Sequence, residues 1–206
     1  MGTTRALAAI VAVPLLFACA TEEPRAVETP AKSGASESGL PRREGSAYYD
    51  TPTVAQALRL GDAAVCGSLV EVLPKHRIVS TEETPKVAEE RVGLSFKIVE
   101  ALAGKYIPGN VVTIESVGYE IDAVTGERVA EIALDGQGPS DWEVGNDYCF
   151  LIADTEVGLQ FRSPELVGRV ATGGLLIPIV SPNHAPDGAE LATLDGLRRL
   201  VEGTNG

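Results

Sequence analysis

Few side chains in this sequence could carry catalytic chemistry. The chain has 206 residues but only two histidines, His76 and His184. A serine nucleophile needs a neighbouring base, and Ser140 and Asp141 with His184 could supply such a hydrolytic arrangement. The H-E-x-x-H, G-x-S-x-G, G-x-G-x-x-G and P-loop patterns are absent. We therefore predict no enzyme, and a Ser140–Asp141–His184 hydrolase is the alternative.

Binding chemistry is limited to two loops. Asp135, Asp141 and Glu143 could hold calcium through carboxylate oxygens, but their spacing misses the EF-hand pattern and favours an ordinary acidic loop. We predict no metal and no cofactor. Trp142, the sole tryptophan, and His184, in a turn-rich loop, are the residues we single out as ligand contacts. For Trp142 we favour a ring that covers one end of the domain over a partly exposed one.

These residues belong to a chain with strand periodicity. Residues 91–101 give the clearest signal, because Val92, Leu94, Phe96 and Ile98 occupy every second position. Residues 148–153 are continuously apolar, which is typical of a central strand covered on both faces. Other strands are predicted over residues 63–73 (interrupted at Pro74), 111–114, 129–134, 159–161 and 175–180.

Two short helices flank the predicted strands. Residues 53–61 have Thr53 or Thr51 to begin a helix and Gly61 to end it. Residues 193–201 have leucines at helical spacing after Thr193. Short strands with turn signals between them and two small helices predict a mostly β fold, either a barrel or a small β-sandwich.

The amino terminus indicates export. Arg5 precedes an apolar run over residues 6–17, which is too short to span a bilayer. The run ends in Leu16-Phe17-Ala18-Cys19. This order resembles a bacterial lipoprotein signal with its lipobox, and the resemblance implies that Cys19 is lipidated, palmitate being a typical acyl group, and becomes the first residue of the mature chain. Cleavage at a small-x-small site, giving a freely secreted product, is the alternative.

The segment after the signal is polar and aperiodic. Residues 19–51 are rich in Glu, Pro, Ser and Gly and cannot bury enough apolar surface to order themselves. We expect a signal peptide over residues 1–18, a lipidated and disordered tether over 19–51, and a single mostly β domain over 52–206. A domain of that size needs no metal to fold.

Cysteines and charge restrict the partners. With Cys19 lipidated, Cys66 and Cys149 remain in predicted strands of an exported domain, so we expect a disulfide between them, with two buried free thiols as the alternative. The net charge of −12 opposes nucleic-acid binding. The basic clusters Arg42-Arg43, Lys75-His76-Arg77 and Arg198-Arg199 are short and indicate solvated surface.

A second resemblance rests on strand order and glycine placement. It covers about residues 61–153, through GDAAVCGSLVEV (61–72), FKIVEALAG (96–104), PGNVVTI (108–114) and VGNDYCFLI (144–152). This series resembles exported bacterial domains, mostly without assigned function, that look like the OB-type barrels of tissue inhibitors of metalloproteinases and netrin modules. Those inhibitors act through an amino-terminal cysteine, which here would be the lipidated Cys19. Inhibition is therefore not carried over.

The sequence as a whole predicts an extracytoplasmic lipoprotein anchored to a bacterial membrane through Cys19. Its β domain would be a non-catalytic module that binds an envelope protein or a small ligand. We place that contact in loops over residues 75–90 and 135–142. The alternatives are the hydrolase above and a passive surface-coat protein.

Overall fold

The computed structural model describes residues 34–35, 39–45, 51–79, 87–134, 137–156, 158–180 and 187–204. Over these ranges the fold is mostly β, with one short helix early and one at the C-terminus, as predicted. The strands are β1 (Gly34–Ala35), β2 (Pro41–Gly45), β3 (Ala63–Val79), β4 (Val87–Ala103), β5 (Val111–Asp122), β6 (Arg128–Leu134), β7 (Asp147–Thr155), β8 (Gly158–Phe161), β9 (Gly168–Val170) and β10 (Leu176–Pro178). The helices are α1 (Val54–Arg59) and α2 (Leu194–Glu202), with 3-10 turns η1 (Pro139–Asp141), η2 (Pro164–Leu166), η3 (Thr172–Gly174) and η4 (Glu190–Ala192).

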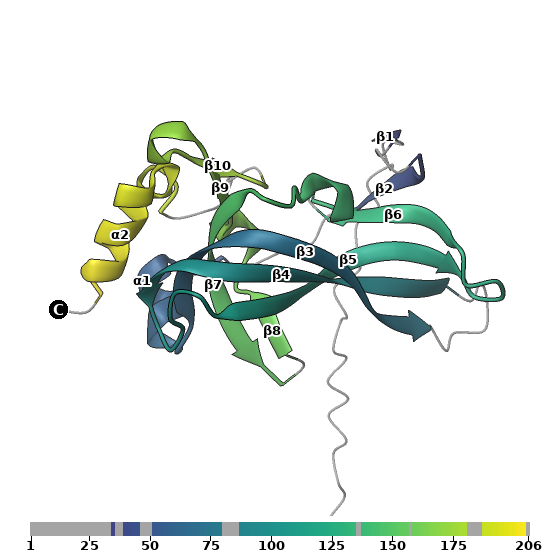
Figure 1. Cartoon of the computed structure of the whole chain (residues 1–206), viewed down its shortest axis with the longest axis horizontal. Helices are drawn as coiled ribbons and strands as arrows, with labels where there is room; N and C mark the ends of the chain where they lie inside the picture. Colours follow the sequence, from purple (N-terminus) through teal and green to yellow (C-terminus); the bar gives the residue numbers. More distant parts are fainter. Residues whose placement is uncertain are drawn as a thin grey trace, which may run out of the picture.

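All described strands belong to one sheet that curls into a half-barrel. Its order is β1-β2-β6-β5-β4-β3-β7-β9-β10, and β8 also pairs with β7. The long strands β3, β4 and β5 run side by side through the centre of the molecule (Figure 1). Every pairing is antiparallel except that of β2 with β6, which is parallel.

The alternation in β4 is confirmed. Val92, Leu94, Phe96 and Ile98 are each no more than 1% exposed and lie in the larger of two hydrophobic clusters. The aromatic members of this cluster surround Phe96, with ring centroids 4.6 to 6.1 Å from it. The concave side of the curled sheet is therefore filled by side chains.

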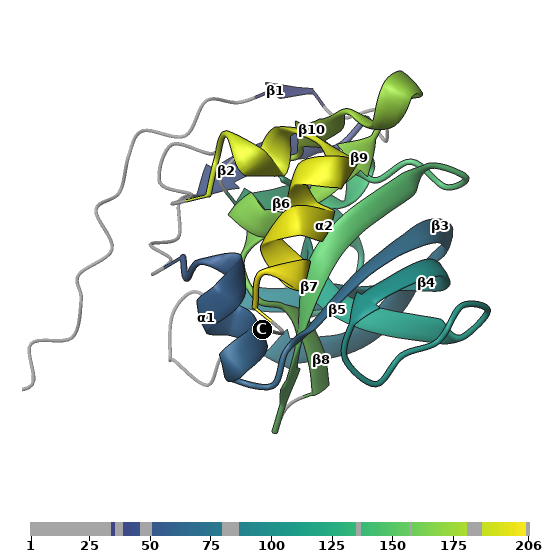
Figure 2. The same ribbon diagram turned by 90° about the vertical axis from the view of Figure 1, so that its left-hand side faces the viewer.

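β7 is covered on both faces, as its continuous apolar sequence predicted. Tyr148, Phe150 and Ile152 lie in the aromatic cluster, whereas Cys149 and Leu151 lie in a second cluster with the two helices. Since successive side chains of a strand face opposite ways, β7 divides the core in two. Figure 2 shows α1 and α2 close together beside β7. We call the second cluster, which contains Cys149, Leu151 and residues of both helices, the helix-side cluster.

Both helices begin at the predicted threonines. The Thr53 hydroxyl accepts a hydrogen bond from the Gln56 N–H, and the Gln56 side chain accepts one from the Thr53 N–H, which is a capping box. The Thr193 hydroxyl accepts from the Gly196 N–H at 3.0 Å. Helix α1 ends at Arg59, just before Gly61 at φ +92°. These local interactions orient the apolar faces of the helices toward β7.

The prediction that a strand stops at Pro74 is wrong. β3 continues to Val79, and its pairing with β7 ends at Ser68, so among the described residues the later part of β3 is paired only with β4. This part of β3 is thus an edge strand among the described residues, and proline, which lacks an N–H, is tolerated in an edge strand. The register with β4 also shifts between Pro74 and Arg77. Residues 75–79 and 87–90, expected in a binding loop, are therefore strand.

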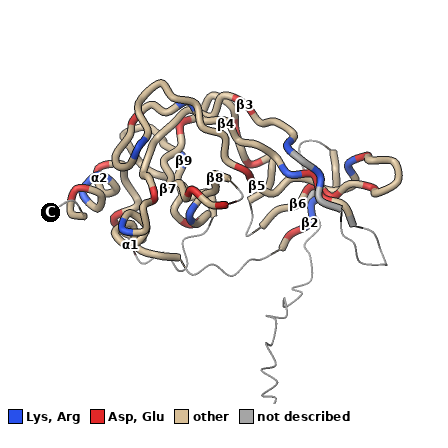
Figure 3. The backbone as a smooth tube through the Cα atoms, turned by 90° about the horizontal axis from the view of Figure 1, so that it is seen from below, with Lys and Arg blue, Asp and Glu red and all other residues tan. Residues whose placement is uncertain are grey.

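The expected tether also needs correction. Pro41–Gly45 form β2, which pairs with β6 in register from Arg42↔Glu131 to Gly45↔Leu134. The Arg42 side chain, expected on solvated surface, is only 13% exposed. Figure 3 shows acidic and basic residues side by side around β2 and β6. Ion pairs between Arg42 and carboxylates of the domain hold residues 41–45 in place. The amino-acid composition of the segment gives no sign of these long-range contacts.

Candidate functional site

The predicted disulfide is present. Cys66 in β3 and Cys149 in β7 are direct partners in the strand register, with 2.03 Å between the sulfurs and 4.0 Å between the Cα atoms. Both residues are buried in the helix-side cluster. Closing a loop with a sequence separation of 83 residues stabilises the fold by about 4.5 kcal/mol in the chain-entropy model. The bond fixes β3 against β7 beside the helices.

A small cavity of about 120 Å³ lies against this disulfide. It is bounded mainly by apolar side chains from β7, from η2 and the residue after it, from β10 and from α2, namely those of Cys149, Leu166, Val167, Leu176 and Leu197. Four of these five residues belong to the helix-side cluster. The cavity therefore lies between β7 and α2. An apolar group that enters it would be transferred from water to an apolar environment.

The polar groups near the cavity already have partners. Glu165, the charged residue in the cavity wall, accepts a hydrogen bond from the Thr51 hydroxyl at 2.7 Å. The Asp187 carboxylate accepts one from the Val54 N–H at 2.7 Å and joins its loop to the start of α1. With these carboxylates hydrogen-bonded, the apolar surface is the main feature that the cavity offers to a ligand.

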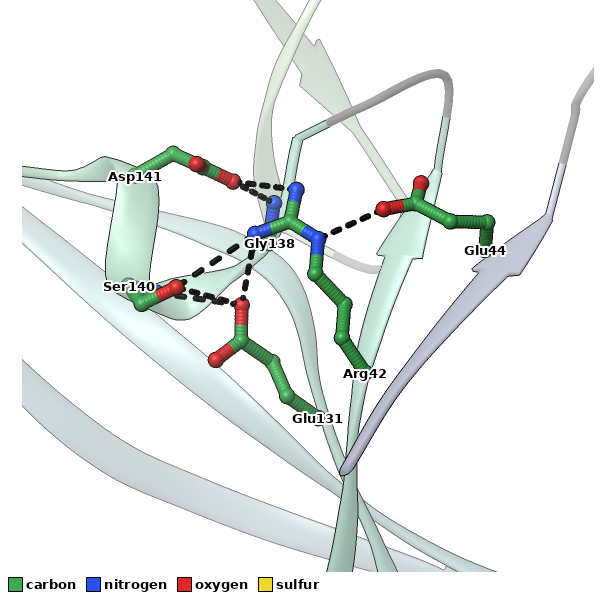
Figure 4. A network of polar contacts seen from close by, with 6 residues as sticks. All are labelled: Arg42, Glu44, Glu131, Gly138, Ser140 and Asp141. Carbon is green, nitrogen blue, oxygen red and sulfur yellow. Dashed lines mark hydrogen bonds and ion pairs between the residues drawn. The ribbon is translucent and has the colours of Figure 1, made fainter. Parts of the chain in front are cut away.

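The second cluster of interest is a polar network around Arg42 (Figure 4). The guanidinium contacts Glu44 at 2.6 Å, Asp141 at 2.7 Å and Glu131 at 3.1 Å. Burial alone would lower the pKa of Arg42, but hydrogen bonds to Asp141 and Glu44 and their charges outweigh it and raise that pKa above its usual value. Arg42 is therefore a permanent cation enclosed by carboxylates.

The same network accounts for two residues of the hydrolase alternative. The Ser140 hydroxyl donates to Oε1 of Glu131 at 2.7 Å. The Asp141 carboxylate accepts from the Gly138 N–H at 2.6 Å and from Arg42. The third residue, His184, lies outside the described residues. Ser140 and Asp141 thus lie close together, but both contact the guanidinium of Arg42.

Trp142 is a core residue. It is 6% exposed and its indole ring stacks on Phe161, with centroids 5.4 Å apart and 12° between the ring planes. Its Nε1 is buried without a hydrogen-bond partner among the described residues. The indole ring of Trp142 packs inside the aromatic cluster and is not a partly exposed surface for a ligand.

The calcium alternative gains no support from the geometry. Asp135 lies outside the described residues, and Glu143 contacts Asn146 and Arg169 rather than sharing a site with Asp141. In the described part of the chain no three His, Cys, Asp or Glu side chains are grouped as metal ligands. Cys19, the predicted lipidation site, also lies outside the described residues.

Sequence reasoning missed both the Arg42 network and the cavity. One signal was available: Glu131 is a lone carboxylate within the apolar strand segment 129–134, where a buried charge demands a partner. Nothing in the local sequence indicates that this partner is Arg42, 89 residues earlier. The cavity arises from packing between distant elements, which leaves no local pattern.

Comparison with protein-family models finds no match, and comparisons with curated proteins and with solved structures find none either. Among the described residues, no helix has the length and apolar character needed to cross a bilayer.

Proposed function

We propose that this protein is an exported, lipid-anchored and non-catalytic binding module whose ligand is a small apolar group. The observation that carries the proposal is the cavity beside the Cys66–Cys149 disulfide. Disulfides persist mainly in oxidising compartments, which supports export. The lipobox-like sequence ending at Cys19 supports a membrane anchor.

The lining of the cavity supports an apolar ligand. Apolar cavities of about 150 Å³ stay dry and accept molecules as small as benzene, and this one has about 120 Å³. A branched aliphatic group of four or five carbons fits that space. Its transfer from water contributes about 0.8 kcal/mol per buried methylene. Because Glu165 is already hydrogen-bonded to Thr51, the site offers little to a strongly polar ligand.

The residues of the hydrolase alternative also support binding over catalysis. A serine nucleophile needs a base positioned to take its proton. Here the Ser140 hydroxyl donates to Glu131, whose Oε1 also receives a hydrogen bond from Arg42. Oε1 of Glu131 is therefore shared between the Ser140 hydroxyl and the Arg42 guanidinium, and it is not dedicated to Ser140. Ser140 and Asp141 therefore serve the attachment of Arg42.

An Ala192→Phe variant tests the cavity. Ala192 is exposed and lines the cavity, so a phenyl ring there would fill its opening. We expect isobutanol and isopentanol to shift the methyl resonances of Leu176 and Leu197 in the wild type. At ten times its dissociation constant, the ligand would raise the free energy of unfolding by about 1.4 kcal/mol. Both effects disappear in Ala192→Phe.

The matched control is Ala189→Phe, because Ala189 is also exposed but does not line the cavity. This variant should bind the alcohols like the wild type. Equal binding by wild type and Ala192→Phe, or methyl shifts confined to residues far from the cavity, would overturn the proposed site.

A further inference from the structure

Strand β2 is attached to the sheet in an unusual way. Its pairing with β6, over four register positions, is the only parallel pairing among the described strands. None of its five residues is buried. β2 therefore has no buried apolar side chain, and it is held by its backbone pairing, by the Arg42 side chain and by an ion pair between Arg43 and Glu120 at 2.9 Å.

The pocket that receives Arg42 belongs to the domain. Glu131 comes from β6, and Ser140 and Asp141 come from η1. The Gly138 N–H donates a hydrogen bond to the Asp141 carboxylate at 2.6 Å, and a Cβ at position 138 would collide with Oε1 of Glu131. Glycine is therefore needed for the carboxylate and the turn to lie this close.

The charges of this pocket require a cation. Glu131 is 0% exposed, and its Oε2 has no hydrogen-bond partner among the described residues. The buried Nε2 of neighbouring Gln137 is likewise unpartnered within the described chain. A buried carboxylate in this state is costly unless a charged donor reaches it. The planar fork of a guanidinium can donate to Glu131, Asp141 and Ser140 at once, whereas an ammonium is a point charge.

We propose that the edge of β6, with the pocket formed by Glu131, Ser140 and Asp141, is a binding site for an extended, arginine-bearing peptide, and that β2 fills it in cis. The peptide adds to the sheet in parallel with β6, so its backbone supplies affinity and the arginine supplies specificity. The site shares no residue with the cavity beside the disulfide.

Because β2 of the same chain occupies the edge of β6, it blocks the binding of a free peptide there. A strand on the same chain competes intramolecularly, at an effective concentration set by the chain that joins it to the domain. A free peptide must displace β2 before it can bind. Removing the Arg42 side chain weakens the competitor without changing the pocket, because Glu131, Ser140 and Asp141 all come from elsewhere in the chain.

The experiment uses the full chain carrying Arg42→Ala and the peptide acetyl-Pro-Arg-Arg-Glu-Gly-amide, which has the sequence of residues 41–45. We expect calorimetric binding to the variant that is tighter than binding to the wild type by about tenfold or more, since charged hydrogen bonds of the competitor are lost. The amide resonances of Ala133 and Leu134 in β6 should shift on binding.

Two altered peptides serve as matched controls. Lysine in place of the first arginine should weaken binding by about tenfold, because the fork is lost. Alanine in place of the second should weaken binding much less, because Arg43 is 65% exposed and its ion pair with Glu120 lies at the surface. Where Arg42→Ala no longer unfolds cooperatively, Arg42→Lys replaces it, since it keeps a charge opposite Glu131. No binding to a folded variant, or equal binding of the lysine peptide, would overturn the proposal.

Discussion

Glu131 is the residue whose surroundings depart furthest from what its chemistry favours. Its carboxylate is fully buried and one oxygen is without a hydrogen-bond partner in the described structure. Burying an isolated carboxylate costs several kcal/mol. Arg42 and Ser140 offset that cost through the other oxygen, Oε1. Arg42 therefore stabilises the domain as well as attaching β2.

At the residue scale we predict that Arg42→Ala lowers the free energy of unfolding by about 3 kcal/mol. The variant leaves Glu131 buried without its cation, which is the costly way to break a buried ion pair. Urea denaturation followed by the fluorescence of Trp142, the only tryptophan, gives the value directly. The double variant Arg42→Ala/Glu131→Gln should recover part of the loss, because the uncompensated charge is gone.

Lys105→Ala is the control for this prediction. Lys105 also forms an ion pair, with Asp154 at 2.6 Å, but both side chains are more than half exposed. Exposed pairs contribute little to stability, so this variant should unfold like the wild type. If Arg42→Ala did the same, the role assigned to the Arg42–Glu131 contact would be wrong.

At the scale of elements, the loop between β5 and β6 has a titratable group. The Asp122 carboxylate accepts hydrogen bonds from the N–H groups of Val124 and Thr125, both at 2.8 Å. These hydrogen bonds lower the pKa of Asp122 below its usual value. Gly126, at φ +73°, completes the turn.

This lowered pKa predicts how the hairpin responds to acid. A carboxyl with a lower pKa when folded adds stability above its unfolded pKa of about 3.9, and the contribution is lost as pH falls through the folded value. The difference in free energy of unfolding between wild type and Asp122→Asn should be constant above about pH 5 and shrink below about pH 4. A difference that grows in acid would contradict this assignment.

The elements also show what sequence can and cannot predict. The alternation in β4 and the apolar run in β7 are local patterns produced by burial, so both strands were predictable. Pro74 led to a wrong strand end because a proline interrupts a strand only where its missing N–H would face a partner strand, and the sequence does not show which side of β3 is paired. β2 was missed because its order comes from Glu131, a contact across 89 residues. The cavity depends on the packing of β7 against α2, which no segment encodes alone.

At the scale of the whole molecule, the curled sheet keeps the two candidate sites separate. The disulfide and the helices form one side of β7, where the cavity lies, whereas the arginine pocket lies on β6 and η1. Under our proposal, the segment that carries β2 also connects the domain to Cys19. A partner that displaces β2 would therefore act on the connection between membrane anchor and domain.

The most direct test of the proposed function is native mass spectrometry of the protein extracted from its own membranes. We expect a chain that begins at Cys19, carries covalent acyl groups, and retains one small apolar adduct that is absent from Ala192→Phe. An unprocessed and unacylated chain, or an adduct spectrum identical in wild type and Ala192→Phe, would contradict the account.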